Sequence, residues 1–404
     1  MSEQTYFRKG FGLKDAIQGA LTDDYHSTLV DEVKSRGNEL SAEGVTVRLA
    51  HEFGFCYGVD RAVDYAYETR QKFPERRIFL VGEIIHNPHV NAKLVAMGIV
   101  IIERGSSGEF DFSGITQDDA VILPAFGVTK ADFDRLRGLG SVLVDTTCGS
   151  VLNVWKRVES YARDGFTALI HGKYFHEETK ATASQVTKYP GGKYLVVRDM
   201  AEARTICDWI ERGAGEALLR ERFAKAVSPG FAFERDLERI GVANQTTMLS
   251  GESLAIAAEV RKSMAVRWGE AEAAVRFRSF DTICSATQDR QDAVLRMLQD
   301  GVSIAVVIGG YNSSNTTHLA ALCAQHVRTF HVEDSACLEP AIRTIRHMPV
   351  GSHAEIAEAG WLPAGPLVVG VTAGASTPNN KVGEVIERIF QTRGIELGAA
   401  LARE

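Results

Sequence analysis

Short apolar runs of strand length recur along this chain, and helical patterns separate them. Runs without polar alternation are typical of strands buried on both faces, as in parallel sheets. The strand-length runs are 46–50, 77–81, 120–123, 141–144, 167–170, 194–197, 302–308 and 366–371. The clearest helical patterns are 24–36, 150–163, 286–299 and 378–392. This alternation predicts βαβ units and an α/β fold with mainly parallel sheets.

Length and composition narrow the class of protein. A chain of 404 residues is long enough for two or three domains. The net charge of −7 leaves no excess of basic residues for nucleic acid. The sequence shows no apolar run of the ~18 residues that a membrane helix requires, and no secretion signal at its N-terminus. Six cysteines without a close pair do not make a disulfide scaffold, so we expect a reducing, cytoplasmic location.

Three cysteines stand in matching positions. The stretches EFGFCYG at 52–58, LVDTTCG at 143–149 and DTICSA at 281–286 each place one cysteine after a short apolar or aromatic run and before a helical pattern. These cysteines are Cys56, Cys148 and Cys284. The other three cysteines lack this setting: Cys207 and Cys323 fall inside helical patterns, and Cys337 falls in a polar loop. We expect these three to be core residues or to have no special role.

Two further loops repeat after each cysteine. About thirty residues after each cysteine, a strand ends in a polar loop, the second loop of the repeat. This loop carries His86 after Cys56, His176 and Glu178 after Cys148, and Asn312 and Asn315 after Cys284. The third loops are LPAFGVTK at 123–130, NQTTML at 244–249 and VTAGASTPNN at 371–380. Ligands of α/β sheets bind beyond the carboxyl ends of the strands, where these loops lie. The repeat therefore predicts a pseudo-threefold protein with one central site.

The repeat also sets the expected domain boundaries. Residues 1–45 form a polar N-terminal extension, and 396–404 form a C-terminal tail. Between them we expect three α/β units at 46–147, 148–282 and 283–395, which begin near the three cysteines. The charged, irregular segment 211–240 is predicted to be an insertion on the surface.

Three converging cysteines indicate a metal group. A cysteine at the first turn of a helix is favoured as the thiolate by the positive helix end. Structural zinc prefers four ligands from closely spaced pairs, which single remote cysteines do not supply. A 4Fe–4S cluster normally takes four thiolates, and with three it keeps one iron open as a Lewis acid for substrate. The alternative is that the three cysteines are small buried hydrophobic residues, and their matching corners argue against it.

The polar loops have the composition of an anion site. Asn312, Ser313, Ser314 and Asn315 stand between a strand and a helix, where backbone N–H groups and short polar side chains can surround a phosphate. Ser376 in GASTP repeats this arrangement. Serine and asparagine are also the commonest helix caps, so each loop alone is a weak signal.

The second loops and the NQTT stretch add candidate residues for substrate binding and acid–base catalysis. His86 and His176 could donate to the same anion, although a single histidine is more often a core or surface residue. Glu178 could be a general acid in a closed pocket, or a solvated carboxylate in the charged run HEETK. Thr246 could position a substrate oxygen, or simply end a strand.

The motifs GFCYGVDRAV, EIIHNP, DTTCGSVLNVW, HEET, QTT, DTICSATQDRQDAV, NSSN and VTAGAST occur in this order. Together they resemble the 4-hydroxy-3-methylbut-2-enyl diphosphate reductase family over residues 46–392. The resemblance implies a trefoil of three α/β domains around one 4Fe–4S cluster, with Cys56, Cys148 and Cys284 as ligands and one iron open. It implies reductive dehydration of (E)-4-hydroxy-3-methylbut-2-enyl diphosphate to isopentenyl and dimethylallyl diphosphate, the last step of the non-mevalonate isoprenoid pathway. Ferredoxin or flavodoxin would supply the electrons.

The same resemblance assigns individual roles. Glu178 matches the proton-donor glutamate of the family. The positions that match its substrate-binding residues are His86, His176, Thr246, Ser313, Ser314, Asn315 and Ser376.

One position departs from the common bacterial pattern of this family. Phe126 in LPAFGV stands where many members have a histidine, and the plant and cyanobacterial branch also carries PAFG. That branch also has an N-terminal extension like residues 1–45, with the stretch RKGFG. A phenyl ring cannot donate to phosphate, so the other donors must hold the diphosphate.

Two other functions use the same residues. A non-redox hydro-lyase with an open-iron cluster would need the same three cysteines, and it would turn over without a reductant. A sensor or structural protein would hold zinc on the thiolates and would be colourless.

Overall fold

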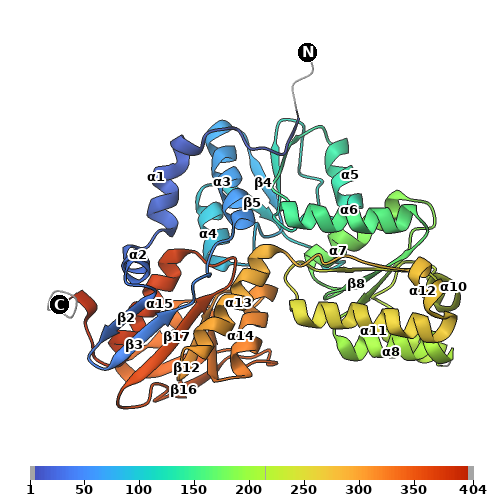
Figure 1. The fold of residues 1–404 in the computed structure, drawn as a ribbon. Coiled ribbons are helices and arrows are strands. Elements are labelled where there is room, and N and C mark those ends of the chain that lie inside the picture. Colours follow the sequence, from blue (N-terminus) through green and yellow to red (C-terminus); the bar gives the residue numbers. More distant parts are fainter. Residues whose placement is uncertain (1–4, 214, 399–404) are drawn as a thin grey trace. The chain divides into compact units, whose positions relative to one another are not determined.

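The computed structural model describes residues 5–213 and 215–398, whose strands form four sheets (Figure 1). By their internal contacts these residues divide into two compact units. The first unit holds the residues up to Lys9, Phe73–Ile84 and Ile99–Cys284; the second holds Gly10–Lys72, Ile85–Gly98 and the residues from Ser285 onward. No helix in the described chain combines the length and the apolar character that crossing a lipid bilayer requires.

The first sheet lies in the first unit and is parallel throughout. Its order is β1 (Tyr6–Phe7), β7 (Val142–Asp145), β6 (Ala120–Leu123), β4 (Ile78–Val81) and β5 (Ile99–Ile102). Helix α5 (Lys130–Gly138) follows β6 and buries Leu136 with Val121 and Leu143 of the sheet. The apolar runs at 77–81, 120–123 and 141–144 are therefore strands, as predicted.

The second sheet lies in the same unit and is also parallel. Its order is β11 (Phe277–Ser279), β10 (Ile240–Asn244), β8 (Thr167–His171) and β9 (Tyr194–Val197). Helices α8 (Met200–Arg212) and α11 (Ser250–Trp268) lie side by side (Figure 1). The other helices around this sheet are α6 (Gly149–Arg163), α7 (Glu177–Ser184), α9 (Glu216–Arg222), α10 (Phe233–Asp236), α12 (Glu270–Arg276) and the 3-10 turn Gln185–Lys188.

The segment 211–240 is not the surface insertion that its charge predicts. Apart from residue 214, which is not described, it contains α9 and α10 and supplies apolar side chains to the core of the second sheet. The buried apolar residues are Leu219, Phe223, Ala226, Phe231, Phe233, Leu237 and Ile240. They are spread among charged residues at irregular intervals, so the segment shows neither a helical nor a strand period.

The third sheet lies in the second unit, in the order β13 (Arg328–Val332), β12 (Ile304–Ile308), β17 (Leu367–Ala373), β3 (Val45–Leu49) and β2 (Glu39–Ala42). All its pairs are parallel except β2 with β3. Its two faces are covered by different helices. On one face lie α15 (Asn379–Thr392) and α2 (Thr28–Ser35), and on the other lie α13 (Ser285–Gln299) and α14 (Ser314–Ala324).

A small antiparallel sheet completes the second unit. Its strands are β14 (Leu338–Glu339), β15 (Thr344–His347) and β16 (Ile356–Ala359). The short 3-10 turns Ser335–Cys337 and Pro340–Ile342 flank β14. Helices α3 (Tyr57–Lys72) and α4 (Pro88–Ala96) also belong to this unit.

The three parallel sheets repeat one strand order. In each sheet, the strand that leads to a cysteine corner pairs with the strand that leads to a third loop (LPAFGVTK, NQTTML or VTAGASTPNN). That strand pairs in turn with the strand that leads to the loop of His86, His176 or Asn312. The orders are β7-β6-β4-β5, β11-β10-β8-β9 and β3-β17-β12-β13. The predicted grouping placed the strand at 46–50 in a first unit with residues up to 147. Instead β3 pairs with β17, near the C-terminus. Parallel strands are joined by long crossover connections, so two strands that pair need not be neighbours in the sequence.

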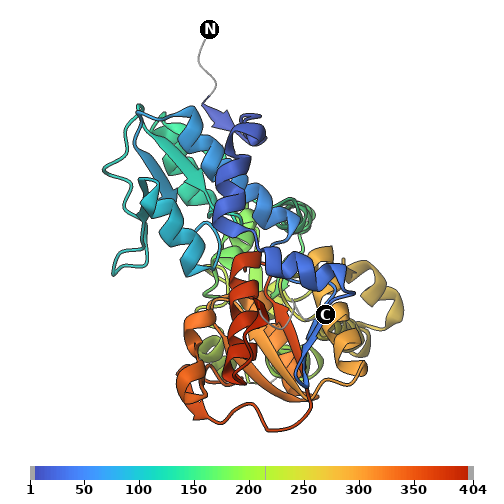
Figure 2. The same ribbon diagram turned by 90° about the vertical axis from the view of Figure 1, so that its left-hand side faces the viewer.

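The described part of the N-terminal extension, residues 5–45, contains two helices. The single helix expected at 24–36 is two helices, α1 (Lys14–Tyr25) and α2, because Ser27 is extended and its hydroxyl accepts from the Val30 N–H at 3.3 Å. Both helices lie beside α15 (Figure 2). The tail predicted at 396–404 lies mostly outside the described residues, which end at 398.

Candidate functional site

Each of the three predicted cysteines stands at a strand-to-helix corner. The helices α3, α6 and α13 begin at the residue after Cys56, Cys148 and Cys284, and all three side chains are partly exposed. In each sheet the cysteine N–H donates to a carbonyl in the loop after the neighbouring strand. The pairs are Cys56 with Ala375 at 3.2 Å, Cys148 with Ala125 at 2.8 Å, and Cys284 with Thr246 at 3.3 Å. The corners are thus equivalent in structure as well as in sequence.

The remaining cysteines differ in environment. Cys207 lies in α8 and Cys323 in α14, as predicted, and Cys337 lies in a short 3-10 turn; all three are buried. Burial raises the pKa of the Cys207 thiol to about 11 and that of Cys323 to about 12. These two sulfurs stay protonated near neutral pH and are poor metal ligands.

In the first unit, Glu178 and Thr246 form a buried pair. Glu178 is the second residue of α7 and is 3% exposed, so it is not a solvated carboxylate of the HEETK run. Its Oε1 accepts from the backbone N–H of Thr246 at 2.6 Å, and its Oε2 accepts from the Thr246 hydroxyl at 3.0 Å. The backbone of Thr246 in turn accepts from the N–H of Cys284. One residue therefore links the candidate acid to a candidate metal ligand.

His176 caps the same helix. Its Nδ1 accepts from the backbone N–H of Glu178 at 3.2 Å, so the proton of a neutral ring lies on Nε2, which can then donate to an anion. The ring of Phe126 packs against it edge-on at 6.3 Å between centroids. Phe126 therefore fixes the orientation of a histidine that carries a donor, although it has no donor of its own.

Gln245 is a residue of this site that sequence reasoning missed. It is fully buried, and its Oε1 accepts from Thr179 Oγ1 at 3.0 Å and from the Lys173 N–H at 3.1 Å. Its Nε2 donates to Thr247 Oγ1 at 2.9 Å. The amide thereby joins α7, the loop before it and the QTT loop. Its position inside the NQTT motif was the signal that could have found it.

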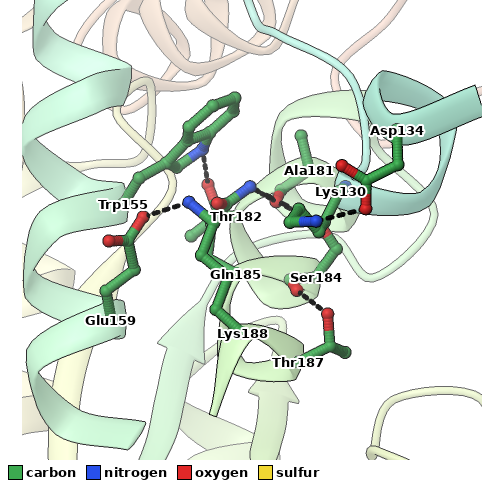
Figure 3. A network of polar contacts seen from close by, with 10 residues as sticks. All are labelled: Lys130, Asp134, Trp155, Glu159, Ala181, Thr182, Ser184, Gln185, Thr187 and Lys188. Carbon is green, nitrogen blue, oxygen red and sulfur yellow. Dashed lines mark hydrogen bonds and ion pairs between the residues drawn. The ribbon is translucent and has the colours of Figure 1, made fainter. Parts of the chain in front are cut away.

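A second network holds α7 from its far end (Figure 3). The indole N–H of Trp155, two turns after Cys148 on α6, donates to Thr182 Oγ1 at 3.1 Å. Lys188, in the turn after α7, forms an ion pair with Glu159 of α6 at 2.6 Å. Gly127 of the PAFG loop lies against the Trp155 ring, which leaves no room for a Cβ. Trp155 thus contacts the helix that carries Glu178 and the loop that carries Phe126.

In the second unit, the NSSN and GAST loops are tied together. Ser313 caps α14 by accepting from the Thr316 N–H at 3.3 Å, and Asn315 Oδ1 accepts from the Ala375 N–H at 2.9 Å. The Ser376 hydroxyl donates to the His86 carbonyl at 3.2 Å. A Cβ on Gly310 would come within 2.8 Å of that same carbonyl oxygen, so only glycine allows this approach.

Two polar groups of these loops have no partner within residues 5–213 and 215–398: Ser314 Oγ and Asn315 Nδ2. Both residues are 3% exposed, and they form the first turn of α14, an eleven-residue helix. Buried donors without acceptors are destabilising unless a ligand satisfies them. The loops therefore fit a phosphate-like anion, which would also benefit from the helix N-terminus. Asn312, in contrast, is exposed.

The fold and these residues define a class of protein: a repeated α/β protein with cysteines at three equivalent helix N-termini and a helix-capping loop with two buried polar groups that have no partner among the described residues. A family model described as LytB protein matches residues 47–390. The chain is 46% identical to 4-hydroxy-3-methylbut-2-enyl diphosphate reductase of Gloeobacter violaceus, over 99% of this chain and 95% of that protein. It is 45% identical to the protein of the same name from Thermosynechococcus vestitus, over 98% and 96%. The chain belongs to the LytB family, whose curated relatives are enzymes of this name.

Solved structures agree with this membership. One is titled as (E)-4-hydroxy-3-methyl-but-2-enyl diphosphate reductase, the terminal enzyme of the non-mevalonate pathway. It superposes with a TM-score of 0.52 at 26% identity, and covers 86% of this chain and 99% of its own. The E-1-hydroxy-2-methyl-but-2-enyl-4-diphosphate reductase of Plasmodium falciparum has a TM-score of 0.62 at 19% identity, over 85% and 87%, and shares the fold.

Proposed function

We propose that this chain reduces (E)-4-hydroxy-3-methylbut-2-enyl diphosphate to isopentenyl diphosphate and dimethylallyl diphosphate, the last step of the non-mevalonate isoprenoid pathway. Its curated relatives carry the name of this activity. The observation that carries the proposal is the set of three equivalent cysteine corners, beside a buried carboxylate in one unit and an anion loop in the other.

The cysteine corners fit a 4Fe–4S cluster held by three thiolates. Cys56, Cys148 and Cys284 each follow a strand and precede a helix, and each N–H is already bonded to a neighbouring loop. A trefoil arrangement of the three sheets around the cluster is part of this proposal. When bound, the cluster would supply single electrons and an iron that acts as a Lewis acid on the allylic hydroxyl group.

The residues of the second unit would bind the diphosphate. Ser314 Oγ and Asn315 Nδ2 offer buried donors that have no acceptor among residues 5–213 and 215–398. Ser313 and Ser376 lie within 3.5 Å of each other through their hydroxyl oxygens, and one of the two protons is available to a phosphate oxygen. His86 joins this group through its carbonyl contact with Ser376, and its ring would supply a further donor.

The residues of the first unit would handle the hydroxyl end of the substrate. Glu178 holds Thr246 through both carboxylate oxygens, so the Thr246 hydroxyl has a fixed position. A protonated Glu178 would deliver its proton, either through this hydroxyl or directly, as the C–O bond breaks and water leaves. His176 Nε2–H would donate to the diphosphate and Phe126 would exclude water.

Electrons would come from ferredoxin or flavodoxin, and a reducing cytoplasmic compartment would keep the thiolates available. The test is turnover of the diphosphate substrate by anaerobically purified protein, with and without a reductant. We expect both five-carbon diphosphates only when a reductant is present. Consumption of the substrate without a reductant would instead support a hydro-lyase, and a colourless, zinc-containing protein would remove the redox function altogether.

A further inference from the structure

Arg290 is a buried arginine that the proposed chemistry does not use. It lies on α13 and is 3% exposed. Its Nη2 donates to the carbonyl oxygens of Gly54 at 2.7 Å and Phe55 at 3.1 Å, and its Nη1 donates to Ala286 O at 2.8 Å. All these residues belong to the second unit. The guanidinium therefore connects the first turn of α13 to the two residues that precede Cys56.

These two carbonyls belong to a corner that is fixed on its other side as well. The Gly54 N–H donates to Ala373 O at 3.2 Å, at the end of β17, and the Cys56 N–H donates to Ala375 O at 3.2 Å, in the loop after it. Gly54 has a φ of +71°, and a Cβ there would lie 3.1 Å from the Thr377 carbonyl oxygen. The N–H groups of the corner are thus held by the end of β17 and the loop after it, and its carbonyls by Arg290.

The charge of Arg290 is not neutralised by a bonded carboxylate. Among the described residues no ion pair includes Arg290, and its Nε has no hydrogen-bond partner. Asp60, in the first turn of α3, is close enough to interact with it electrostatically. Burial raises the pKa of the Asp60 carboxyl group, and the charges of Lys14 and Arg290 offset this only in part. A buried cation of this kind is costly unless an anion lies nearby.

We infer that Arg290 is a positioning residue for Cys56: its guanidinium holds the Gly54–Phe55 carbonyls in place and offsets the negative charge of a ligating Cys56 thiolate. This role rests on the proposed function of Cys56 as a cluster ligand. The planar guanidinium group of Arg290, with its forked N–H donors, reaches three carbonyl oxygens at once. The single ammonium group of lysine cannot do so. Positive charge near a cluster also favours its reduction, since reduction adds an electron.

Three variants of the full-length, cluster-loaded protein separate these contributions. Arg290→Gln removes the charge and the fork, and Arg290→Lys keeps the charge alone. Arg296→Gln, an exposed arginine on the same helix, is the matched control. The measurements are iron retained during incubation with a chelator, the midpoint potential of the cluster, and thermal unfolding of the iron-free protein.

We expect Arg290→Gln to lower the affinity for the cluster by ~10–100-fold, as loss of a residue that orients a ligand typically does. Its midpoint potential should become more negative. Arg290→Lys should also lose iron faster than the parent but keep a potential close to it, because the charge remains. Arg296→Gln should match the parent in all three measurements.

Iron retention and potential at the parent level in a folded Arg290→Gln protein would overturn the inference while leaving the proposed function intact. A fall in the stability of the iron-free protein, with no change in the other two measurements, would overturn it as well. If Arg290→Gln does not fold, Arg290→Lys decides: parent-level iron retention contradicts the role of the fork, and faster iron loss supports it. A parent protein without iron would overturn both the inference and the proposed function.

Discussion

Replacement of Glu178 by glutamine separates acid chemistry from geometry in the first unit. Glutamine has the size of glutamate but cannot deliver a proton. Thr246 donates two hydrogen bonds to the carboxylate, one from its backbone N–H at 2.6 Å and one from its hydroxyl at 3.0 Å. We expect kcat to fall ~10²–10⁴-fold, the usual effect of a lost general acid, with a KM close to that of the parent.

The structure sets the size of the accompanying loss in stability. The glutamine Oε1 can still accept from the Thr246 N–H, and the Thr246 hydroxyl can rotate to accept from the new Nε2–H group. The two hydrogen bonds with Thr246 survive, and loss of their charge-assisted part costs about 1–2 kcal/mol of unfolding free energy. Glu178→Ala, in contrast, leaves the buried N–H of Thr246 without its acceptor, which costs about 1–3 kcal/mol for that group alone, and it opens a cavity.

The assay compares parent, Glu178→Gln and Thr246→Val proteins, each anaerobically purified and normalised to iron content. Thr246→Val removes the hydroxyl but keeps the backbone bond to the carboxylate. Reductant-driven turnover gives kcat and KM, and urea unfolding gives stability. A cluster-replete Glu178→Gln protein with nearly parental kcat would refute the role of Glu178 as the acid. A large rise in KM with unchanged kcat would instead assign it to ground-state binding.

Three further outcomes follow from the described contacts. Ser314→Ala should leave stability unchanged, because its Oγ has no partner within the described chain, and should raise KM ~10-fold or more by removing a donor from a bound anion. Trp155→Phe should lower the unfolding free energy by about 1–3 kcal/mol, because Thr182 Oγ1 loses its donor, and should reduce kcat without loss of iron. Burial lowers the pKa of His331 to about 4 in the folded protein. The ordinary pKa of histidine is ~6.5, so as pH falls the unfolded chain binds a proton at this residue before the folded protein does. The contribution of neutral His331 to the unfolding free energy is therefore complete above pH ~6.5 and is lost towards pH ~4. Urea unfolding should therefore show about 2 kcal/mol less stability at pH 5 than at pH 7 from this group, and His331→Gln should remove that difference.

The strands and the cysteine corners could be predicted because their signals are local. A buried strand is a short apolar run, and a cysteine just before a helical pattern marks a corner. The runs at 120–123 and 194–197 match β6 and β9 at both ends. The equivalence of the corners follows from the repeat along the chain, and the structure adds the bond from each cysteine N–H to the neighbouring loop.

Pairing between distant strands could not be predicted from such signals. β3 at 45–49 joins β17 at 367–373, and nothing in either run specifies the other. The segment 211–240 fails for a related reason, since Phe223 and Phe233 are buried by tertiary contacts that no local period announces. Long-range packing decides both cases.

The supporting residues of the site were visible in the sequence only as members of motifs. Gln245 stands in NQTT, Trp155 in DTTCGSVLNVW and Arg290 in DTICSATQDRQDAV. Their roles depend on partners 66, 27 and 236 positions away, respectively Thr179, Thr182 and Gly54. A buried arginine or tryptophan looks the same in sequence as an exposed one, so only the folded structure distinguishes these residues.

The most direct test of the proposed cluster is the metal content of anaerobically purified protein in matched cysteine variants. Cys148→Ser removes a partly exposed thiol at a helix N-terminus, and Cys207→Ser removes a buried thiol inside α8. We expect brown parent and Cys207→Ser proteins with about four iron and four sulfide per chain, and a Cys148→Ser protein that has lost most of both, together with its activity. Full iron and activity in Cys148→Ser, or a colourless parent that contains zinc, would contradict the central claim that the three corner cysteines hold one iron–sulfur cluster.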